Sequence, residues 1–294
     1  MEYFLELLTS GIMLGGLYGV VALGLVLIYK ATKVFNFAQG ELVMIASYFF
    51  LTITVTWGFP IWLGFLGTFL LCALFGLLLE RIILRPVIGQ PILAIIMMTI
   101  SLSAALKGFA ILVWGGRRQN LPAFIPLEAL EVGNVHISQP LLWCFVAALL
   151  ATAIFTYFFK RSRLGLIMRA AADGHEIARS VGIRVTQVFG RSWAISAMLA
   201  AIGGIFIGTM QGVDPELGYI GIVALPVAIL GGLDSLPGAI IGGLVVGATE
   251  TLAAGYLDAM VGGGLREVTP FVVMAIIVLI RPTGLFGLET IERI

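Results

Sequence analysis

Charged residues are scarce in this sequence, and hydrophobic residues are in large excess. Only 11% of the 294 residues are charged and 60% are hydrophobic, whereas ordinary soluble domains contain roughly 25% charged residues. One or two soluble domains of this length would not need so many apolar side chains, so the composition predicts an integral membrane protein. The net charge of +1 gives no reason to expect a nucleic acid partner.

Cysteine and histidine are also rare. Cys72 and Cys144 lie inside apolar segments, so we expect them to face lipid or to pack against other helices and not to form a disulfide framework. His136 and His175 are isolated in the sequence. We therefore expect no metal site, and no Ser-His-Asp arrangement can be proposed. These absences argue against a membrane enzyme.

The sequence also lacks a P-loop. That motif needs Gly-Lys-Ser/Thr, because its lysine must reach the phosphates of a nucleotide. The four lysines of this chain follow Tyr29, Thr32, Leu106 and Phe159, and none follows a glycine. The chain is therefore expected to have no ATP site of its own.

Long apolar runs are what the sequence has in abundance. A helix needs about 20 mainly apolar residues to cross the hydrocarbon of a bilayer, and these runs are too long and too uniformly apolar for barrel strands. The start, MEYFLELL, lacks the basic region of a cleaved signal peptide, so the first run is expected to be a retained span. Shorter runs lie near 217–232, 237–256 and 268–280. The six long runs are Leu8–Tyr29, Leu42–Trp57, Ile61–Leu79, Pro91–Val113, Pro140–Phe159 and Val188–Met210.

The sequence thus predicts an all-α integral membrane protein, with residues 1–294 forming a single multi-span helical bundle. Basic residues indicate its orientation, because cytoplasmic loops carry an excess of lysine and arginine. Seven of them lie from the end of the fifth long run to the first turn of the sixth: Lys160, Arg161, Arg163, Arg169, Arg179, Arg184 and Arg191. This segment is predicted to be cytoplasmic, which puts the N-terminus outside and the C-terminus inside a bacterial-type inner (plasma) membrane. The pair at 217–256 then either crosses twice or is re-entrant.

One polar interruption lies between two of the shorter runs, in ILGGLDSLPGAIIGG. Gly231, Gly232 and Pro237 disfavour a continuous helix there, and Asp234 and Ser235 place polar groups at the break. Two interpretations stay open. The break is either an unwound point at membrane depth that lines a substrate path, or a simple turn between helices just outside the bilayer.

A second polar interruption, VFNFAQGE, precedes the apolar run that starts at Leu42. The stretches GVVALGLVLI (19–28) and GIVALPVAIL (221–230) resemble each other, and each precedes one interruption. This similarity predicts a weak internal repeat with broken or re-entrant helices and a site between its halves. The alternatives are helix capping for the polar residues and ordinary packing for the phenylalanines. The predicted translocation-path residues are Asn36, Phe37, Gln39, Glu41, Asp234 and Ser235.

The segment Arg163–Ile183 has the only long polar helical pattern in the chain. Gly174 within it favours two short helices over one. The segment lacks the bulky aromatic face of a membrane-surface helix, so docking to a partner is the preferred interpretation. Its small alanines would permit close approach to a partner, and four charges are predicted to orient the contact: Arg169, Asp173, Glu176 and Arg179.

Four motifs together resemble one family, the permease subunits of ABC importers that take up branched-chain amino acids. They occur in the family's order and span nearly the whole chain: VALGLVLIYKATKVFNFAQGEL, RAAADGHEIARSVGI, VAILGGLDSLPGAIIGG and RPTGLFG. The resemblance implies that the loop at about 160–187 contacts an ATPase. It also implies a second permease subunit, two cytoplasmic ATPases that hold ATP and Mg²⁺, and an extracytoplasmic substrate-binding protein.

The resemblance leaves the substrate open. Gln39 stands where many members of the family have histidine, and relatives carry urea, amides or aromatic acids. An ion-driven secondary transporter, with Asp234 or Glu41 binding the coupling ion, and a passive channel are the other function classes. The alanine-rich charged loop disfavours an ion-driven carrier, which has no evident need of it.

Overall fold

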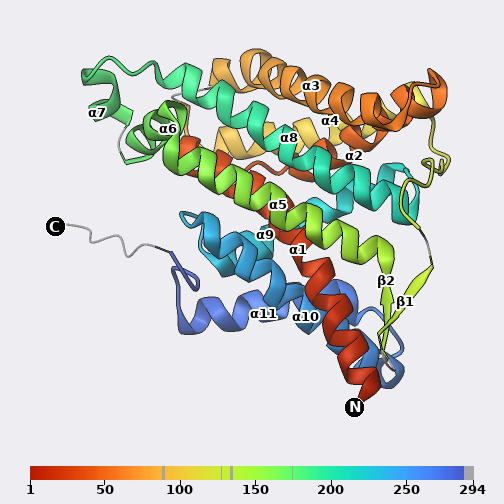
Figure 1. The fold of residues 1–294 in the computed structure, drawn as a ribbon. Coiled ribbons are helices and arrows are strands. Elements are labelled where there is room, and N and C mark those ends of the chain that lie inside the picture. Colours follow the sequence, from red (N-terminus) through yellow and green to blue (C-terminus); the bar gives the residue numbers. More distant parts are fainter. Residues whose placement is uncertain (88–89, 127, 133–134, 174, 288–294) are drawn as a thin grey trace.

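The apolar runs form long helices in the computed structural model, which describes residues 1–87, 90–126, 128–132, 135–173 and 175–287 (Figure 1). Among these residues, seven helical segments are long and apolar enough to cross a membrane. The chain is thus a multi-span helical membrane protein, as its sequence predicts. The seven segments are Glu2–Thr32, Gln39–Thr56, Ile61–Val87, Ile92–Trp114, Gln139–Arg161, Val185–Gln211 and Leu236–Val261.

The helix bounds follow the predicted runs closely for α3, α4, α5 and α8. Short π-helical segments, η1 (Thr52–Thr56) and η2 (Glu80–Leu84), continue α2 and α3, and 3-10 turns lie at η3 (Arg85–Val87) and η4 (Pro215–Tyr219). The α-helices are α1 (Glu2–Thr32), α2 (Gln39–Leu51), α3 (Ile61–Leu79), α4 (Ile92–Trp114), α5 (Gln139–Arg161), α6 (Arg163–Asp173), α7 (His175–Ser180), α8 (Val185–Gln211), α9 (Ile220–Gly231), α10 (Leu236–Val261) and α11 (Leu265–Ile280).

Two antiparallel strands, β1 (Ala129–Val132) and β2 (Val135–Ser138), form a hairpin where the sequence predicts only a loop. The hairpin lies beside the N-terminal part of α1 (Figure 1). There the backbone N–H of His136 donates a hydrogen bond of 3.0 Å to Oε1 of Glu6. The hairpin therefore marks the same end of the bundle as the N-terminus.

The opposite end of the bundle, called the basic end below, carries α6, α7 and the last turn of α1 (Figure 1). Lys33 closes α1 there in the left-handed conformation, with a φ of 58°. The turn between α9 and α10 lies at the same end, because Lys30 Nζ donates to the carbonyl of Asp234 at 3.2 Å. The polar interruption at Asp234 and Ser235 is therefore a simple turn between helices.

α10 returns from that turn along the whole length of α1. Near its other end, the Tyr3 hydroxyl donates to the carbonyl of Gly255 at 3.1 Å. η4 and α9 together bring the chain from the end of α8 to the basic end, and α10 takes it back. The segments at 217–256 thus run through the bundle in opposite directions, and of the two α10 alone is long and apolar enough to cross a membrane as one helix.

α1 and α10 approach each other closely because glycines line their contact. A Cβ atom at Gly11 would lie 2.6 Å from the carbonyl oxygen of Gly247, and one at Gly243 would lie 2.6 Å from the backbone nitrogen of Gly19. Lipid tails are as apolar as the helix surfaces, so packing at short range is a main source of attraction between membrane helices. These small residues fix the antiparallel register of the two helices.

Cys72 and Cys144 are both buried as free thiols. Of the two predicted roles, packing between helices is the one that the structure gives them. Within the described part of the chain, no group of three or more His, Cys, Asp or Glu side chains could hold a metal ion.

Candidate functional site

The chain re-enters the bundle after α1 and starts α2 in its interior. Gln39, the first residue of α2, accepts a hydrogen bond of 2.9 Å from the hydroxyl of Ser196, which lies near the middle of α8. Asn36 Nδ2 donates to the same Gln39 oxygen at 3.3 Å, and Asn36 Oδ1 accepts from the backbone of Ala38 at 3.1 Å. Asn36 and Gln39 are buried. In this conformation the amide pair anchors the start of α2 to α8, and among the residues described no side chain caps the helix.

α9 also starts in the interior, and it meets α2 there from the opposite direction. A Cβ atom at Gly40 would lie 2.8 Å from the backbone nitrogen of Gly221. The first turns of α2 and α9 can therefore touch only because position 40 is glycine. A helix N-terminus carries partial positive charge. Glu41 lies in the first turn of α2, beside Gly218. Two interrupted helices with opposed directions are typical of transporter cores.

Asp234 and Ser235 lie apart from this junction, in the turn at the basic end. Lys33 Nζ is 2.7 Å from Asp234 Oδ1, and both side chains are partly exposed. Ser235 Oγ caps α10 by accepting from the backbone N–H of Gly238 at 3.1 Å. Phe37 is exposed, with its ring centroid 6.3 Å from that of Phe35. The structure thus brings Asn36, Gln39 and Glu41 to one junction and leaves Asp234 and Ser235 at another place.

Single cysteines test whether these positions face water. We expect Asp234→Cys to react readily with a small polar thiol reagent, because its side chain is partly exposed. Gln39→Cys should be protected in the resting state, because Gln39 is fully buried, and should react only if transport opens the α2–α9 junction. The measurement is the labelling rate with and without trapped ATP. Fast labelling of Gln39→Cys in the resting state would contradict a closed junction.

The predicted coupling segment forms two short helices, α6 and α7, as expected from Gly174, which itself lies outside the described residues. Arg169 donates to the carbonyl of Phe159, and its guanidinium carbon lies 5.4 Å from the Phe159 ring centroid. It therefore fastens α6 to the end of α5. Arg179 is exposed on α7. Asp173 and Glu176 lie on α6 and α7, but their side chains are outside the described part of the structure.

Two alanines of this segment do not face outward. Ala171 and Ala178 are 0% and 1% exposed, so they pack within this chain. The expectation that their small side chains let a partner approach is wrong, because helices of the same chain already cover them. The exposed apolar residues at this place are Leu166 and Val181, which are 60% and 70% exposed.

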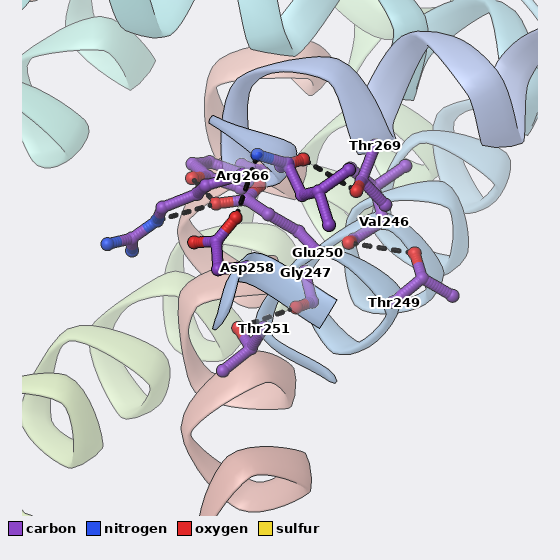
Figure 2. Close-up of polar contacts among 10 residues, drawn as sticks. Val246, Gly247, Thr249, Glu250, Thr251, Asp258, Arg266 and Thr269 are labelled. Atoms are coloured by element: carbon purple, nitrogen blue, oxygen red, sulfur yellow. Dashed lines mark hydrogen bonds and ion pairs between the residues drawn. The ribbon is translucent and has the colours of Figure 1, made fainter. Parts of the chain in front are cut away.

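A cavity of about 240 Å³ contains a charged cluster that the sequence predictions missed. Oε1 of Glu250 on α10 accepts a hydrogen bond from the Tyr18 hydroxyl at 3.1 Å. The same oxygen accepts from Arg266 Nε at 2.9 Å (Figure 2). The Glu250 side chain is only 2% exposed. Its Oε2 is buried without a hydrogen-bond partner among the described residues, and an unsatisfied buried acceptor costs about 1–3 kcal/mol.

A sequence feature could have found this cluster. Glu250 is the only charged residue in the apolar run at 237–256. A carboxylate at membrane depth costs about 3 kcal/mol on insertion scales, so such residues usually face a polar interior and serve a function.

The comparisons with known proteins agree on one family. The family described as "Branched-chain amino acid transport system / permease component" matches residues 7–281. The permease protein LivH of a high-affinity branched-chain amino acid transport system in Escherichia coli (strain K12) is 31% identical, with 99% of this chain and 98% of the relative covered. The corresponding permease protein BraD of Pseudomonas aeruginosa is 30% identical with the same coverage.

A solved structure shares the fold. It is PsaBC from Streptococcus pneumoniae in complex with Fab, and one of its chains matches with a TM-score of 0.51 and 17% identity. The match covers 96% of this chain and 93% of that chain. Because a sequence model matches nearly the whole chain and full-length relatives are about one-third identical, the protein belongs to the family of branched-chain amino acid transport permeases, as a membrane-spanning transport subunit.

Proposed function

We propose that this chain is the permease subunit of an ATP-driven importer that moves branched-chain amino acids across an inner membrane. The observation that carries the proposal is the full-length similarity to LivH and BraD, whose names state branched-chain amino acid transport. Urea, amides and aromatic acids are the alternative cargoes, since Gln39 departs from the histidine that many family members have. Family membership favours an ABC importer over an ion-driven carrier or a passive channel.

The transporter contains, in this proposal, a second permease subunit, two cytoplasmic ATPases and an extracytoplasmic substrate-binding protein. ATP and Mg²⁺ bind to the ATPases, because this chain has no P-loop lysine. The basic end faces the cytoplasm according to the positive-inside rule. The N-terminus and the hairpin then lie outside, where the binding protein delivers the substrate.

The junction of α2 and α9 is the proposed gate within this subunit. Gly40 and Gly221 hold two helix starts together by close contact, and such a contact can exist in two discrete arrangements, packed or separated. Separation would expose Asn36, Gln39 and Glu41 to the path, with Phe37 beside them. Asp234 and Ser235 then lie at the cytoplasmic exit. ATP binding in the partner shifts the population between the two arrangements.

Uptake by the reconstituted complex tests the proposal. The tagged chain is purified with its native partners and placed in proteoliposomes together with its binding protein. We expect L-leucine uptake to require ATP and to persist when ionophores abolish proton and sodium gradients, because the driving force comes from hydrolysis. Uptake that continues without nucleotide and stops with an ionophore would instead show an ion-driven carrier.

A parallel screen identifies the cargo. The binding protein is tested by thermal shift against branched-chain amino acids, amides, urea and aromatic acids. Stabilisation by a bound ligand grows with its concentration relative to the dissociation constant. Leucine, isoleucine or valine should therefore give the largest shift. A larger shift with urea or an aromatic acid would keep the transporter class and change the substrate.

A further inference from the structure

We propose that the cavity at Glu250 is a binding site for a zwitterionic aliphatic α-amino acid, with the substrate ammonium on Glu250 and its carboxylate on Arg266. The choice of ligand rests on the proposed function, but the site itself is argued from geometry. The cavity lies between α1, α8, α10 and α11 and the start of α9. Its volume is about 240 Å³, below the roughly 300–1,000 Å³ of pockets for drug-sized ligands, which suits an amino acid.

The cavity has an apolar wall opposite its charged groups. A branched aliphatic side chain would lie against this wall, and burial of apolar surface would favour it over a polar side chain. Three helices and η4 supply the wall, so its shape depends on the packing of the whole bundle. The apolar lining residues are Leu14, Leu17, Ile207, Leu217, Ile220 and Val223.

The charged groups favour a ligand with a cationic end. Glu216, Glu250 and Glu267 line the cavity together with one arginine, Arg266. Lys107, outside the lining, pairs with Glu216 at 2.9 Å, so Glu250 and Glu267 remain against Arg266 and carboxylates exceed cations by one. Glu250 Oε2 is buried and has no hydrogen-bond partner among the residues described. An ammonium donates three hydrogen bonds and accepts none, and bonds between ionised groups are the stronger ones. The free acceptor therefore matches an amino group.

In this structure Arg266 is the cation that faces Glu250. Its Nε binds Glu250, while its side chain is 59% exposed, and its two terminal nitrogens point away from the carboxylate (Figure 2). A substrate ammonium that enters replaces this contact. Arg266 then turns its planar fork to the substrate carboxylate, which it can bind with two parallel hydrogen bonds. The glycines at 262–264, with φ values of 86°, 99° and 89°, join α11 to α10 and support such a shift.

Protection of an introduced thiol tests the site while Glu250 and Arg266 stay unchanged. Ile220→Cys places a thiol on the apolar wall of the purified complex, where Cys72 and Cys144 are buried. We expect L-leucine to slow its reaction with a small polar thiol reagent by roughly tenfold or more, as occupancy excludes the reagent. 4-Methylpentanoate, which lacks the ammonium, and 3-methylbutylamine, which lacks the carboxylate, should protect weakly. Equal protection by the amine would show a simple cation site and overturn the assignment.

Glu250→Gln in the same background removes the negative charge and keeps the shape. We expect leucine protection and leucine uptake to fall roughly tenfold or more, the scale of one lost hydrogen bond to a charged group. Glu80→Gln is the matched control, because Glu80 is equally buried and pairs with Arg85 at 2.9 Å but does not line the cavity. If Glu250→Gln fails to fold, the comparison of leucine with its two analogues on Ile220→Cys still decides.

The outcomes separate this site from the proposed function. ATP-driven leucine uptake without leucine protection at Ile220→Cys would overturn the site and leave the function standing. Leucine-specific protection without ATP-driven uptake of any amino acid would overturn the function and keep the site. Unchanged protection and uptake in Glu250→Gln would also overturn the site.

Discussion

Gly247→Ala is expected to destabilise the folded permease by about 1–3 kcal/mol, the usual range for overpacking of a tight contact. A Cβ atom at Gly247 would lie 2.5 Å from both the backbone nitrogen and the Cα of Gly15. These are backbone atoms, so the contact cannot be relieved by rotating a side chain. α1 and α10 must therefore move apart, and they lose the close packing that holds them together. Gly247→Val should prevent assembly of the folded subunit.

Gly108→Ala is the control for that experiment. Gly108 lies on α4, and nothing lies within 4 Å of the position that its Cβ would occupy. Alanine has the higher helix propensity by about 1 kcal/mol in exposed helices. Stability should therefore stay the same or rise slightly. The measurement is the free energy of unfolding of the purified chain in mixed detergent. Equal stability of Gly247→Ala and Gly108→Ala would contradict a role for the glycine contact.

The long helices were predictable because each apolar run is bounded by residues that end it. Ile61–Leu79 follows Pro60 and matches the predicted run, and α4 starts directly after Pro91. The length needed to cross a bilayer is fixed by its thickness. Run length and terminating residues together therefore set most of the bundle.

The interior helix starts were harder to place. The sequence puts a polar interruption at Asp234, but the structure makes this a turn at the basic end and breaks the chain instead around Pro215. The segment GVDPELGY has the glycine, proline and carboxylates of a break, yet it lies at the edge of a short run. Depth in the bundle depends on which helices pack side by side. Periodicity along one segment cannot supply that information.

The burial of Ala171 and Ala178 shows the same limit for the site. Small residues at helical spacing fit a partner's surface and fit this chain's own helices equally well, so composition does not choose between them. In the structure these alanines pack within the chain, because α6 packs against α5, α1 and α8. Glu250 illustrates the opposite case. A single carboxylate in an apolar run can be identified as a candidate functional residue from the sequence alone.

Val181→Asp is expected to weaken attachment of the ATPase by roughly tenfold to a hundredfold, and to reduce ATP-driven uptake to a similar extent. Val181 follows α7 at the basic end, is 70% exposed, and belongs to the segment that the sequence predicts to be cytoplasmic. If an ATPase covers it, the variant loses apolar burial and places a charge in the interface. Arg179→Glu should act in the same direction, because charges around an interface orient its partner.

Whether the substituted residue is buried or exposed decides how a loss of uptake is interpreted. Trp at Ala171 or Ala178 would overpack the chain itself, so loss of uptake there would say nothing about a partner. Val181 is exposed, and Asp at an exposed site should leave the permease folded. Leu130→Asp is the matched control, since Leu130 is 40% exposed on the hairpin at the opposite end of the bundle. Copurification of the ATPase and substrate-stimulated hydrolysis are then compared. If Val181→Asp matches Leu130→Asp in both, the exposed surface at α7 is an ordinary solvated face, and coupling must occur elsewhere on the basic end.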